Sequence, residues 1–434
     1  MRKEEILGEA ITSRTARVGV IGLGYVGLPL AVEFAKAGFS VVGIDVQRPK
    51  VDLVNKVESY IQDISSETLS ELVNSGRIKA TNDFSVIQQL DTIDICVPTP
   101  LRKTKDPDMS YIVSATQEIA KYLRSGTLVI LESTTYPGTT DELVLPMLVR
   151  DDLKVGEDFF LCFSPERVDP GNPKYQTVNI PKVVGGITEA CTRMGALFYA
   201  QALDKVVPVS STRVAEMVKL LENTFRMINI GLVNEMALMC DRMRINVWEV
   251  IEAAATKPFG FMPFFPGPGL GGHCIPIDPF YLSWKTKQAG IEARFIELAG
   301  CINGQMPHFV VDKVQNALND HSKPLKGSHV HIMGMAYKKD IDDVRESPAL
   351  DIFHLLTQRG AKTTYSDPFV PHIHMDGIRV SSEDAEQMAA VADCTVIATD
   401  HSGVDYTNIV VTSKLIVDTR NALKNSVSAK IVRL

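Results

Sequence analysis

The chain has 434 residues, which is more than one hydrophobic core usually supports, so we expect two or three domains. Its net charge of −7, with acidic and basic residues mixed along the chain, excludes the basic surface of a nucleic-acid-binding protein. No apolar run approaches the roughly 18 residues of a membrane span, and the polar N-terminus lacks the apolar core of a signal peptide. Seven scattered cysteines with no CxxC pair are typical of reduced thiols in a cytoplasmic protein, and they predict neither a disulfide framework nor a metal site.

The first 200 or so residues alternate short apolar runs with helical stretches. Near-continuous apolarity of the runs predicts a parallel sheet covered by helices on both faces, a doubly wound α/β domain. The predicted strands are 16–22, 41–45, 92–98, 127–134, 159–166, 182–186 and 205–209.

The pattern changes after Ser210. Residues 211–245 contain one Gly and no Pro, and their Ser and Thr start predicts one capped helix of roughly 50 Å. Because apolar residues occur on most of its faces, we expect it to be buried between domains or subunits. The Gly/Pro-rich segment 260–279 that follows predicts a shaped loop.

A second α/β series follows Lys326, with strands predicted at 329–335, 362–367, 394–400 and 414–420 and a helix from Ser347. The fold class is therefore α/β, with a long helix between two α/β domains. We predict an NAD-binding domain over 1–209, a helical connector and dimerisation region over 210–322, and a second α/β domain over 323–434.

A GxGxxG sequence lies between the first predicted strand and the next helix. Gly22, Gly24 and Gly27 permit a tight turn and a close approach of a pyrophosphate to the helix N-terminus. Asp45 follows 18 residues after Gly27, where a carboxylate can bind the ribose diol and disfavour a 2′-phosphate. The pattern predicts NAD, although Arg48 and Lys50 lie close by, and glycines that only form a tight turn are the alternative.

Two segments around the predicted long helix carry reactive or charged groups. Cys274 lies among glycines and prolines instead of in an apolar run, which favours a nucleophile over a packing residue. Asp278, four residues later, either organises that thiol or caps the next helix. Glu216, Lys219 and Asn223 share one helix face, which is either a site or a solvated stripe.

Two more segments end predicted strands with polar residues, namely LESTTYPGTT (131–140) and FSPERVDPGN (163–172). Ligands of such sheets bind at the carboxyl ends of the strands, so both segments are candidates for a site. Ordinary turn chemistry is the alternative for each.

Taken together, these segments resemble the UDP-glucose/GDP-mannose dehydrogenase family. The resemblance covers nearly the whole chain in order, and its motifs are VIGLGYVGLPLA, VPTP, STTYPGTT, SPERVDPG, AEMVKLLENTFR, GPGLGGHCIPIDP, GMAYKKDIDDVRESPA and DTRN. It implies two Rossmann-like domains joined by a long central helix that also builds a homodimer or a higher homo-oligomer. It further implies NAD as cofactor and a UDP-sugar as substrate, with no nucleic acid, membrane or metal.

The resemblance also implies roles for individual residues. Those for catalysis are Cys274, Lys219, Asn223, Asp278, Thr134 and Glu166. Those for the cofactor are Gly22, Gly24, Tyr25, Val26, Gly27, Asp45, Thr99, Thr134 and Arg345. Those for the substrate are Glu166, Arg167, Val168, Lys219, Asn223, Gly271, Lys338 and Arg420.

The chain departs from the family pattern at two places. Asp169-Pro170-Gly171 stands where many members carry a second acidic residue, so the acid that activates the hydrolytic water is open. Glu132 stands where UDP-glucose enzymes commonly have Lys. The sequences of the motifs are most similar to those of enzymes that act on 2-acetamido sugars, above all UDP-N-acetylglucosamine. UDP-N-acetylmannosamine, UDP-N-acetylgalactosamine and UDP-glucose are the alternative substrates.

The implied chemistry is a four-electron oxidation of the C6 hydroxyl to a uronate through a thiohemiacetal and a thioester on Cys274, for surface polysaccharide such as lipopolysaccharide O-antigen. Two alternatives stay open. A two-electron dehydrogenase of the β-hydroxyacid type would release one NADH per turnover and need no Cys274. A non-catalytic nucleotide-sugar binder would release none.

Overall fold

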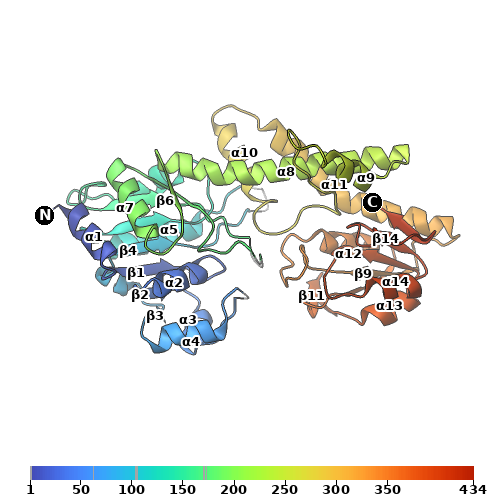
Figure 1. Ribbon diagram of the computed structural model, residues 1–434, viewed down its shortest axis with the longest axis horizontal. Helices are drawn as coiled ribbons and strands as arrows, with labels where there is room; N and C mark the ends of the chain where they lie inside the picture. Colours follow the sequence, from blue (N-terminus) through green and yellow to red (C-terminus); the bar gives the residue numbers. More distant parts are fainter. Residues whose placement is uncertain (1, 62, 103–105, 170–171, 173) are drawn as a thin grey trace. The chain divides into compact units, whose positions relative to one another are not determined.

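The computed structural model describes residues 2–61, 63–102, 106–169, 172 and 174–434. The chain forms two compact units, Met1–Glu222 with Phe280–Gly290, and Asn223–Pro279 with Ile291–Leu434. We call them the N-terminal unit and the C-terminal unit, and each is an α/β structure (Figure 1). The three-domain division at 209 and 322 stays a prediction. In the described part of the chain, no helix is both long enough and apolar enough to cross a membrane.

The N-terminal unit contains an eight-stranded sheet with the order β3-β2-β1-β4-β5-β6-β7-β8. The strands are β1 (Arg17–Ile21), β2 (Ser40–Ile44), β3 (Ile78–Thr81), β4 (Thr92–Ile95), β5 (Leu128–Leu131), β6 (Phe160–Phe163), β7 (Lys182–Gly186) and β8 (Val206–Val209). All seven predicted strands are present, and β3 is an addition that the apolar pattern did not indicate. One expectation was wrong: β7 pairs antiparallel to β6, because the described part of their connection contains no helix that could return the chain for a parallel pairing.

Helices cover both faces of this sheet. Successive residues of β5 point to opposite sides, so that Ile130 joins the apolar cluster under α1, α2 and α7, whereas Val129 and Leu131 join the cluster under α5. The helices are α1 (Lys3–Thr12), α2 (Gly27–Lys36), α3 (Arg48–Asn55), α4 (Ser66–Asn74), α5 (Ser110–Tyr122), α6 (Leu145–Leu148) and α7 (Glu189–Tyr199), with the 3₁₀-helix η1 (Phe84–Gln89) and the π-helix η2 (Thr139–Val144). The unit is doubly wound, as predicted.

The long helix α8 (Thr212–Met243) confirms the single helix predicted from 211 to 245. Ser211 caps its start, since the Ser211 Oγ accepts a hydrogen bond from the Val214 N–H at 3.3 Å. The helix ends where Arg244 adopts a left-handed φ of 58°. Within the single chain the helix is partly buried, since Leu221 and Leu232 are 64% and 53% exposed; burial against a second subunit stays a prediction.

The C-terminal unit contains a five-stranded parallel sheet with the order β10-β9-β13-β14-β15, together with a β11–β12 hairpin. Its strands are β9 (His329–Met333), β10 (Lys362–Ser366), β11 (His372–Met375), β12 (Ile378–Ser381), β13 (Cys394–Ile397), β14 (Ile416–Asp418) and β15 (Ile431–Arg433). Its helices are α9 (Val247–Ala254), α11 (Arg294–Asp320), α12 (Pro348–Gln358), α13 (Ala385–Val391) and α14 (Tyr406–Thr412), whereas α10 (Asp278–Gln288) begins in this unit and continues in the other.

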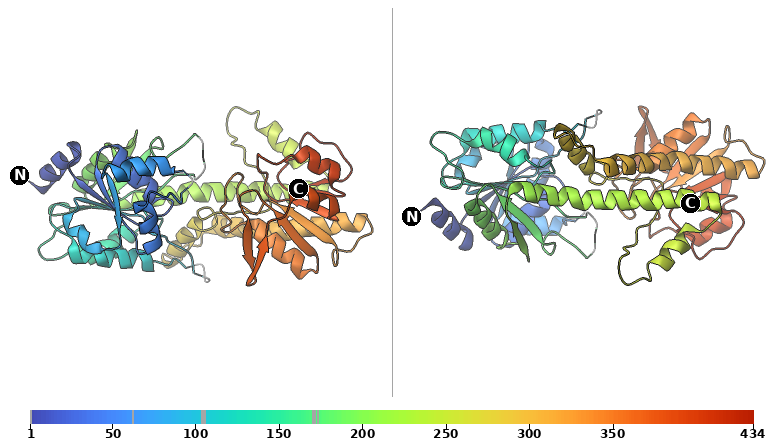
Figure 2. Two further views of the ribbon diagram at one scale, coloured as in Figure 1. Left: turned by 90° about the horizontal axis from the view of Figure 1, so that it is seen from below. Right: turned by 90° about the horizontal axis from the view of Figure 1, so that it is seen from above.

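Apolar residues again cover both faces of the second sheet. Ile332 and Val396 join a cluster with α11 and α12, whereas Ile397 and Ile416 join a cluster with α13 and α14. Figures 1 and 2 show the helices of this unit arranged around its strands. The second α/β domain is therefore doubly wound as well, and the predicted fold class is confirmed. The hairpin, β15 and α11 were not among the predicted elements.

Candidate active site

The loop between β1 and α2 has the shape of a dinucleotide cradle. A Cβ on Gly22, whose φ is 95°, would lie 2.5 Å from the Cys96 carbonyl oxygen, and one on Gly27 would lie 1.9 Å from the Gly22 carbonyl oxygen. A Cβ on Gly24 would meet no described atom within 4 Å. The outer glycines are thus required by the fold, whereas Gly24 keeps space open where a pyrophosphate would approach the start of α2.

Asp45 ties this loop to the end of β2. Its Oδ2 accepts a hydrogen bond from the Leu23 N–H and its Oδ1 accepts one from the Gln47 N–H, both at 2.8 Å. Each carboxylate oxygen can accept a second bond, so the predicted contact with a ribose diol is compatible with this geometry. The Lys50 Nζ lies 3.9 Å from Oδ2, close enough to weaken discrimination against a 2′-phosphate.

The remaining predicted cofactor residues lie in different surroundings. Tyr25, which is 45% exposed, and Val26, which directly precedes α2, both lie in the β1–α2 loop. Thr99 is buried, and its carbonyl accepts a hydrogen bond from the Tyr281 hydroxyl at 2.5 Å. Thr134 is half-buried three residues after β5. Arg345 belongs to the C-terminal unit, where its guanidinium pairs with Asp343 at 2.7 Å.

Glu166 is held firmly at the carboxyl end of β6. Its Oε1 accepts hydrogen bonds from the Arg167 and Val168 N–H groups, both at 2.7 Å, and its Oε2 lies 3.4 Å from the Lys182 Nζ. Burial alone would raise the pKa of Glu166, but the Lys182 ammonium, the backbone donors and Lys219 hold it below its usual value. The carboxyl is therefore ionised and able to accept a proton.

Two cations fix the segment around Glu166. The Lys219 Nζ donates to the Glu166 carbonyl oxygen at 2.5 Å, so Lys219 contacts the backbone of this residue. The Arg167 guanidinium pairs with Glu222 on α8 at 2.6 Å and donates to the Pro181 carbonyl at 2.7 Å. Pro170 and Gly171 of the open water-activating position lie outside the described residues.

The polar residues predicted to share one face of α8 are buried. Glu216, Lys219 and Asn223 are 0%, 7% and 6% exposed, so the alternative of a solvated stripe is wrong. Glu216 accepts hydrogen bonds from the Gly138 N–H at 2.7 Å and from the Thr140 N–H at 2.9 Å. Burial raises the pKa of Glu216 to about 7 despite these donors.

Asn223 meets Asp278 within the C-terminal unit. The Asn223 side-chain amide donates to the Asp278 Oδ2 at 2.5 Å, and Asp278 is only 2% exposed. Asp278 is also the first residue of α10, and its N–H donates to the Cys274 carbonyl at 2.8 Å. Asp278 thus begins a helix, as one of the two interpretations expects, and its carboxylate contacts Asn223; its role in organising the thiol stays a prediction.

The glycines of the Cys274 loop permit close contacts with the second α/β domain. A Cβ on Gly267 would lie 2.8 Å from an Arg420 guanidinium nitrogen, and a Cβ on Gly271 would lie 2.4 Å from the Tyr337 Cβ. The Arg420 Nε donates to the Ala398 carbonyl at 2.8 Å. Gly271, a predicted substrate residue, thus lies against Tyr337, and Tyr337 precedes the half-buried Lys338 in the sequence.

Cys274 differs from the packed cysteines of the chain. Cys96, Cys162 and Cys394 are buried, and burial raises the pKa values of their thiols, that of Cys394 to about 12. A thiol in that state is a poor nucleophile. Cys274 is instead half-buried in a Gly/Pro-rich loop.

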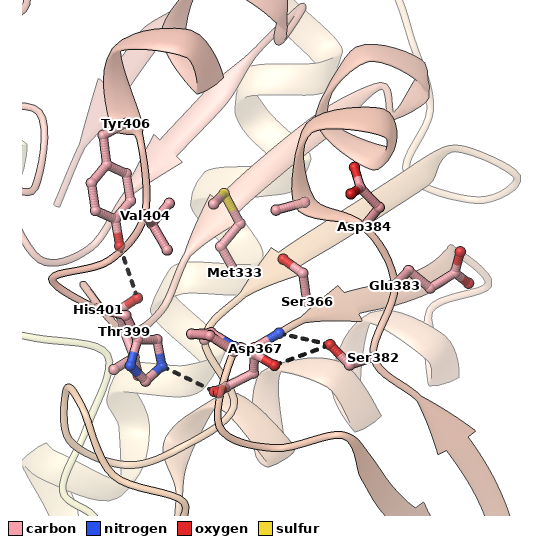
Figure 3. A pocket seen from close by; sticks show the side chains of 13 residues that line it. Met333, Ser366, Asp367, Ser382, Glu383, Asp384, Thr399, His401, Val404 and Tyr406 are labelled. Atoms are coloured by element: carbon pink, nitrogen blue, oxygen red, sulfur yellow. Dashed lines mark hydrogen bonds and ion pairs between the residues drawn. The ribbon is translucent and has the colours of Figure 1, made fainter.

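The second sheet has a cavity of about 230 Å³ at the carboxyl ends of β9, β10 and β13 (Figure 3). Asp367 closes one side of it, with its Oδ2 accepting hydrogen bonds from the Met335 N–H at 2.6 Å and from His401 at 3.0 Å. This acid ties a loop to a strand end, as Asp45 does in the first sheet. The described residues that line the cavity include none of the predicted substrate residues.

The predicted catalytic residues fall into two groups. Thr134, Glu166 and Lys219 belong to the N-terminal unit, whereas Asn223, Cys274 and Asp278 belong to the C-terminal unit. Four buried polar residues lie behind Glu166; sequence reasoning noted Glu132 only as a departure from the family pattern and missed Asp94, Lys182 and Tyr199. Charged residues inside or beside apolar strand runs were the available signal. Among the described residues, no group of three or more His, Cys, Asp or Glu side chains could hold a metal ion.

The similarity to known proteins extends over nearly the whole chain. Three family models match it: the NAD binding domain, the central domain and the UDP binding domain of the UDP-glucose/GDP-mannose dehydrogenase family, over residues 16–203, 213–305 and 331–425. A UDP-N-acetyl-D-mannosamine dehydrogenase from Pyrococcus horikoshii is 34% identical over 414 residues, covering 94% of this chain and 96% of the relative.

Solved structures of dehydrogenases are also similar to this chain over nearly its whole length. The structure of a UDP-D-ManNAc dehydrogenase from Pyrococcus horikoshii has a TM-score of 0.87 at 34% identity, covering 96% of this chain and 98% of the other. An NDP-N-acetyl-D-galactosaminuronic acid dehydrogenase from Methanosarcina mazei Go1 has a TM-score of 0.81 at 32% identity, covering 100% of this chain and 97% of the other.

Proposed function

Since this chain belongs to the UDP-glucose/GDP-mannose dehydrogenase family and is an NAD-dependent UDP-sugar dehydrogenase, we propose that it oxidises C6 of a UDP-2-acetamido sugar to the carboxylate. UDP-N-acetyl-D-mannosamine is the first candidate, because the relative from Pyrococcus horikoshii carries that name. The expectation that UDP-N-acetylglucosamine is favoured has no support among these relatives. It remains an arm of the test, together with the galactosamine and glucose analogues.

The observation that carries the proposal is the arrangement around Cys274. A half-buried thiol lies one helical turn before Asp278, and the carboxylate of Asp278 is held by the Asn223 amide at 2.5 Å. In an NAD-dependent alcohol oxidation, a nucleophilic thiol has a use only if the aldehyde must be held for a second oxidation. This argues for a four-electron reaction and against a simple alcohol dehydrogenase.

Bound NAD supplies the hydride acceptor for each of the two oxidations. In the first oxidation, the C6 hydroxyl gives up its proton to Glu166 through a water while C6 loses a hydride, which leaves an aldehyde. The Cys274 thiolate then adds to the aldehyde carbon, forming a C–S bond and an alkoxide. The Asn223 amide and the Lys219 ammonium stabilise that negative charge.

A second hydride loss from C6 converts the thiohemiacetal into a thioester. Water then adds to the thioester carbon, the C–S bond breaks, and the uronate and the thiol are released. Two hydrides therefore leave for each sugar, and hydrolysis makes the sequence irreversible. Glu166 is ionised before the reaction, so it can take a proton from the substrate or from the attacking water.

The test is the number of NADH molecules released per sugar, measured with a panel of UDP-hexoses. We expect two for the preferred substrate and the highest kcat/KM for UDP-N-acetyl-D-mannosamine. One NADH per sugar would indicate the two-electron alternative, and the highest rate on UDP-glucose would contradict the acetamido preference.

Cys274→Ser tests the covalent step. We expect this variant to bind NAD and substrate but to stall at or before the second oxidation. Cys301→Ser is the matched control, because Cys301 is an exposed cysteine on α11 and should leave the rate unchanged. If Cys274→Ser still releases two NADH per sugar at a near-normal rate, the role of Cys274 is wrong.

We also propose that α8 pairs with a second copy of the chain. Leu232, Met239 and Met243 are 53%, 45% and 58% exposed on this helix, and solvent-exposed apolar side chains repeated along one helix are typical of an interface. Sedimentation should report a dimer, and Leu232→Glu should shift it toward the monomer. A monomeric wild-type protein would contradict this proposal.

A further inference from the structure

A network of five polar side chains, four buried and one half-buried, crosses the carboxyl edge of the first sheet and ends at the half-buried Glu166; we call it the polar network. Its members come from β4, from the residue after β5, from the loop after β6, from β7 and from the end of α7, and they are Asp94, Glu132, Glu166, Lys182 and Tyr199. Asp94 and Tyr199 are 0% exposed, Glu132 is 1% exposed and Lys182 is 5% exposed. The proposed catalytic steps use only the last member, Glu166.

Lys182 is the centre of this polar network. Its Nζ lies 2.8 Å from the Glu132 Oε2 and 3.4 Å from the Glu166 Oε2, so one ammonium serves two carboxylates. It also lies 5.3 Å from the centre of the Tyr199 ring. An ammonium with so little exposure to water is stable only when its partners stay ionised.

The proton count at Tyr199 shows which of the other carboxyls is neutral. The Tyr199 oxygen is 3.1 Å from the Asp94 Oδ1 and also bonds the Glu132 Oε1, yet a tyrosine hydroxyl has one proton to donate. One of the two carboxyls must therefore donate to the tyrosine oxygen. Glu132 is paired with Lys182, so the proton belongs to Asp94.

Two further observations agree with a neutral Asp94. Among the described residues, the Asp94 Oδ2 is buried and has no hydrogen-bond partner, which would be costly for a carboxylate. Burial, with the nearby charge of Glu132, raises the pKa of Asp94 well above its usual value. The polar network thus contains the neutral side chains of Asp94 and Tyr199, the ammonium of Lys182, and the carboxylates of Glu132 and Glu166.

We propose that Lys182 is a positioning residue for Glu166: its ammonium, anchored by Glu132, keeps the Glu166 carboxylate ionised and directed so that it can accept the substrate proton. This inference rests on the proposed role of Glu166 as the proton acceptor. Lys182 itself contacts no reacting atom in this scheme and acts through Glu166.

The other charged groups around Glu166 cannot replace Lys182. Lys219 on α8 donates to the Glu166 backbone carbonyl, and Arg167 pairs with Glu222. The Cys96 thiol lies in the same field but is neutral, because burial raises its pKa. Without Lys182, Glu166 would keep its two backbone donors but would share a poorly hydrated region with the Glu132 carboxylate. Its proton affinity would rise.

The experiment measures kcat and KM for the UDP-sugar across pH with the full chain and NAD. In Lys182→Met we expect the acid limb of kcat to move upward by about one to three pH units, since an opposite charge at this distance shifts a carboxyl by that amount. The loss at low pH should appear in kcat and leave KM for the sugar near the wild-type value. Lys182→Arg keeps the charge and should restore the wild-type profile.

A matched control separates this effect from general damage. Lys313 is another buried lysine, 9% exposed and paired with Asp241 at 2.5 Å in the C-terminal unit. Lys313→Met should lower stability but leave the acid limb where it is. The double variant Lys182→Met with Glu132→Gln removes both charges of the pair, leaves no unpaired buried carboxylate at 132, and should fold while showing the same upward shift.

The outcomes distinguish this inference from the proposed function. If Glu166→Gln retains the wild-type rate and pH profile, Glu166 is not the proton acceptor, and the proposed role of Glu166 fails. A second outcome is that Glu166→Gln is slow, whereas Lys182→Met or the double variant is folded and keeps the acid limb of kcat at the wild-type pH. In that case only the inference about Lys182 is overturned. A shift in Lys313→Met equal to that in Lys182→Met would also overturn it.

Discussion

The glycines of the β1–α2 loop allow folding and cofactor binding to be perturbed separately. In Gly27→Ala the new Cβ would lie 1.9 Å from the Gly22 carbonyl oxygen, so the backbone must move. Overpacking of this kind costs about 3 kcal/mol. At about 2–4 °C per kcal/mol for a domain of this size, the melting temperature should fall by about 6–12 °C.

Gly24→Ala should behave in the opposite way. Its Cβ meets no described atom within 4 Å, and its φ is not in the left-handed region, so the free protein should fold with an unchanged melting temperature. The methyl group would instead occupy the space through which a pyrophosphate reaches the backbone N–H groups. Loss of one charge-assisted hydrogen bond costs about 1.5–3 kcal/mol, so the Kd for NAD should rise about ten- to hundredfold.

The assay is thermal unfolding of both variants without and with NAD, combined with calorimetric titration of NAD. Wild-type protein and Gly24→Ala should melt together without NAD and separate when NAD is added. Gly27→Ala should melt early in both conditions. If Gly24→Ala binds NAD as tightly as the wild type, the open space at Gly24 is not the pyrophosphate site and the cradle has been misassigned.

Three further outcomes follow from the contacts described above. Asn223→Asp places a second carboxylate at 2.5 Å from Asp278. The free energy of unfolding, measured with urea, should fall by about 1–3 kcal/mol, and by more at pH 8 than at pH 5, because both carboxylates are charged at the higher pH. An equal decrease at both pH values would exclude charge repulsion as the cause. The pKa of Glu216 is about 7 in the folded chain against an ordinary 4.5, so its contribution to stability is complete below pH 4.5 and is lost as pH rises through 7. Relative to Glu216→Gln, the wild type should therefore lose up to about 3 kcal/mol between pH 5 and pH 8, and parallel curves would contradict this. Gly267→Ala should displace the Arg420 guanidinium, which lies 2.8 Å from the new Cβ. We expect KM for the UDP-sugar to rise about tenfold and KM for NAD to stay unchanged. An unchanged KM for the UDP-sugar would show that Arg420 does not belong to the substrate site.

The sequence alone predicted the features that depend on local pattern. The strand-loop-helix with three glycines, the uninterrupted helix from 211 and the Gly/Pro-rich loop around Cys274 all require particular residues within a short stretch, and each is present where it was expected. The strands were predictable because both faces of the sheets are covered, which makes the strands apolar throughout. Weakly apolar edge strands such as β3 and β15 lack that signal and were missed.

Only the tertiary structure decided how buried charges pair. Lys182 meets Glu132 across 50 positions of sequence, and Glu216 meets Thr140 across 76, because strand order and helix packing bring their elements together. A buried charge must find a partner, but the chain pattern does not say which one. The same reason explains why the face of Glu216, Lys219 and Asn223 could be read as either solvated or buried until the packing around α8 was known.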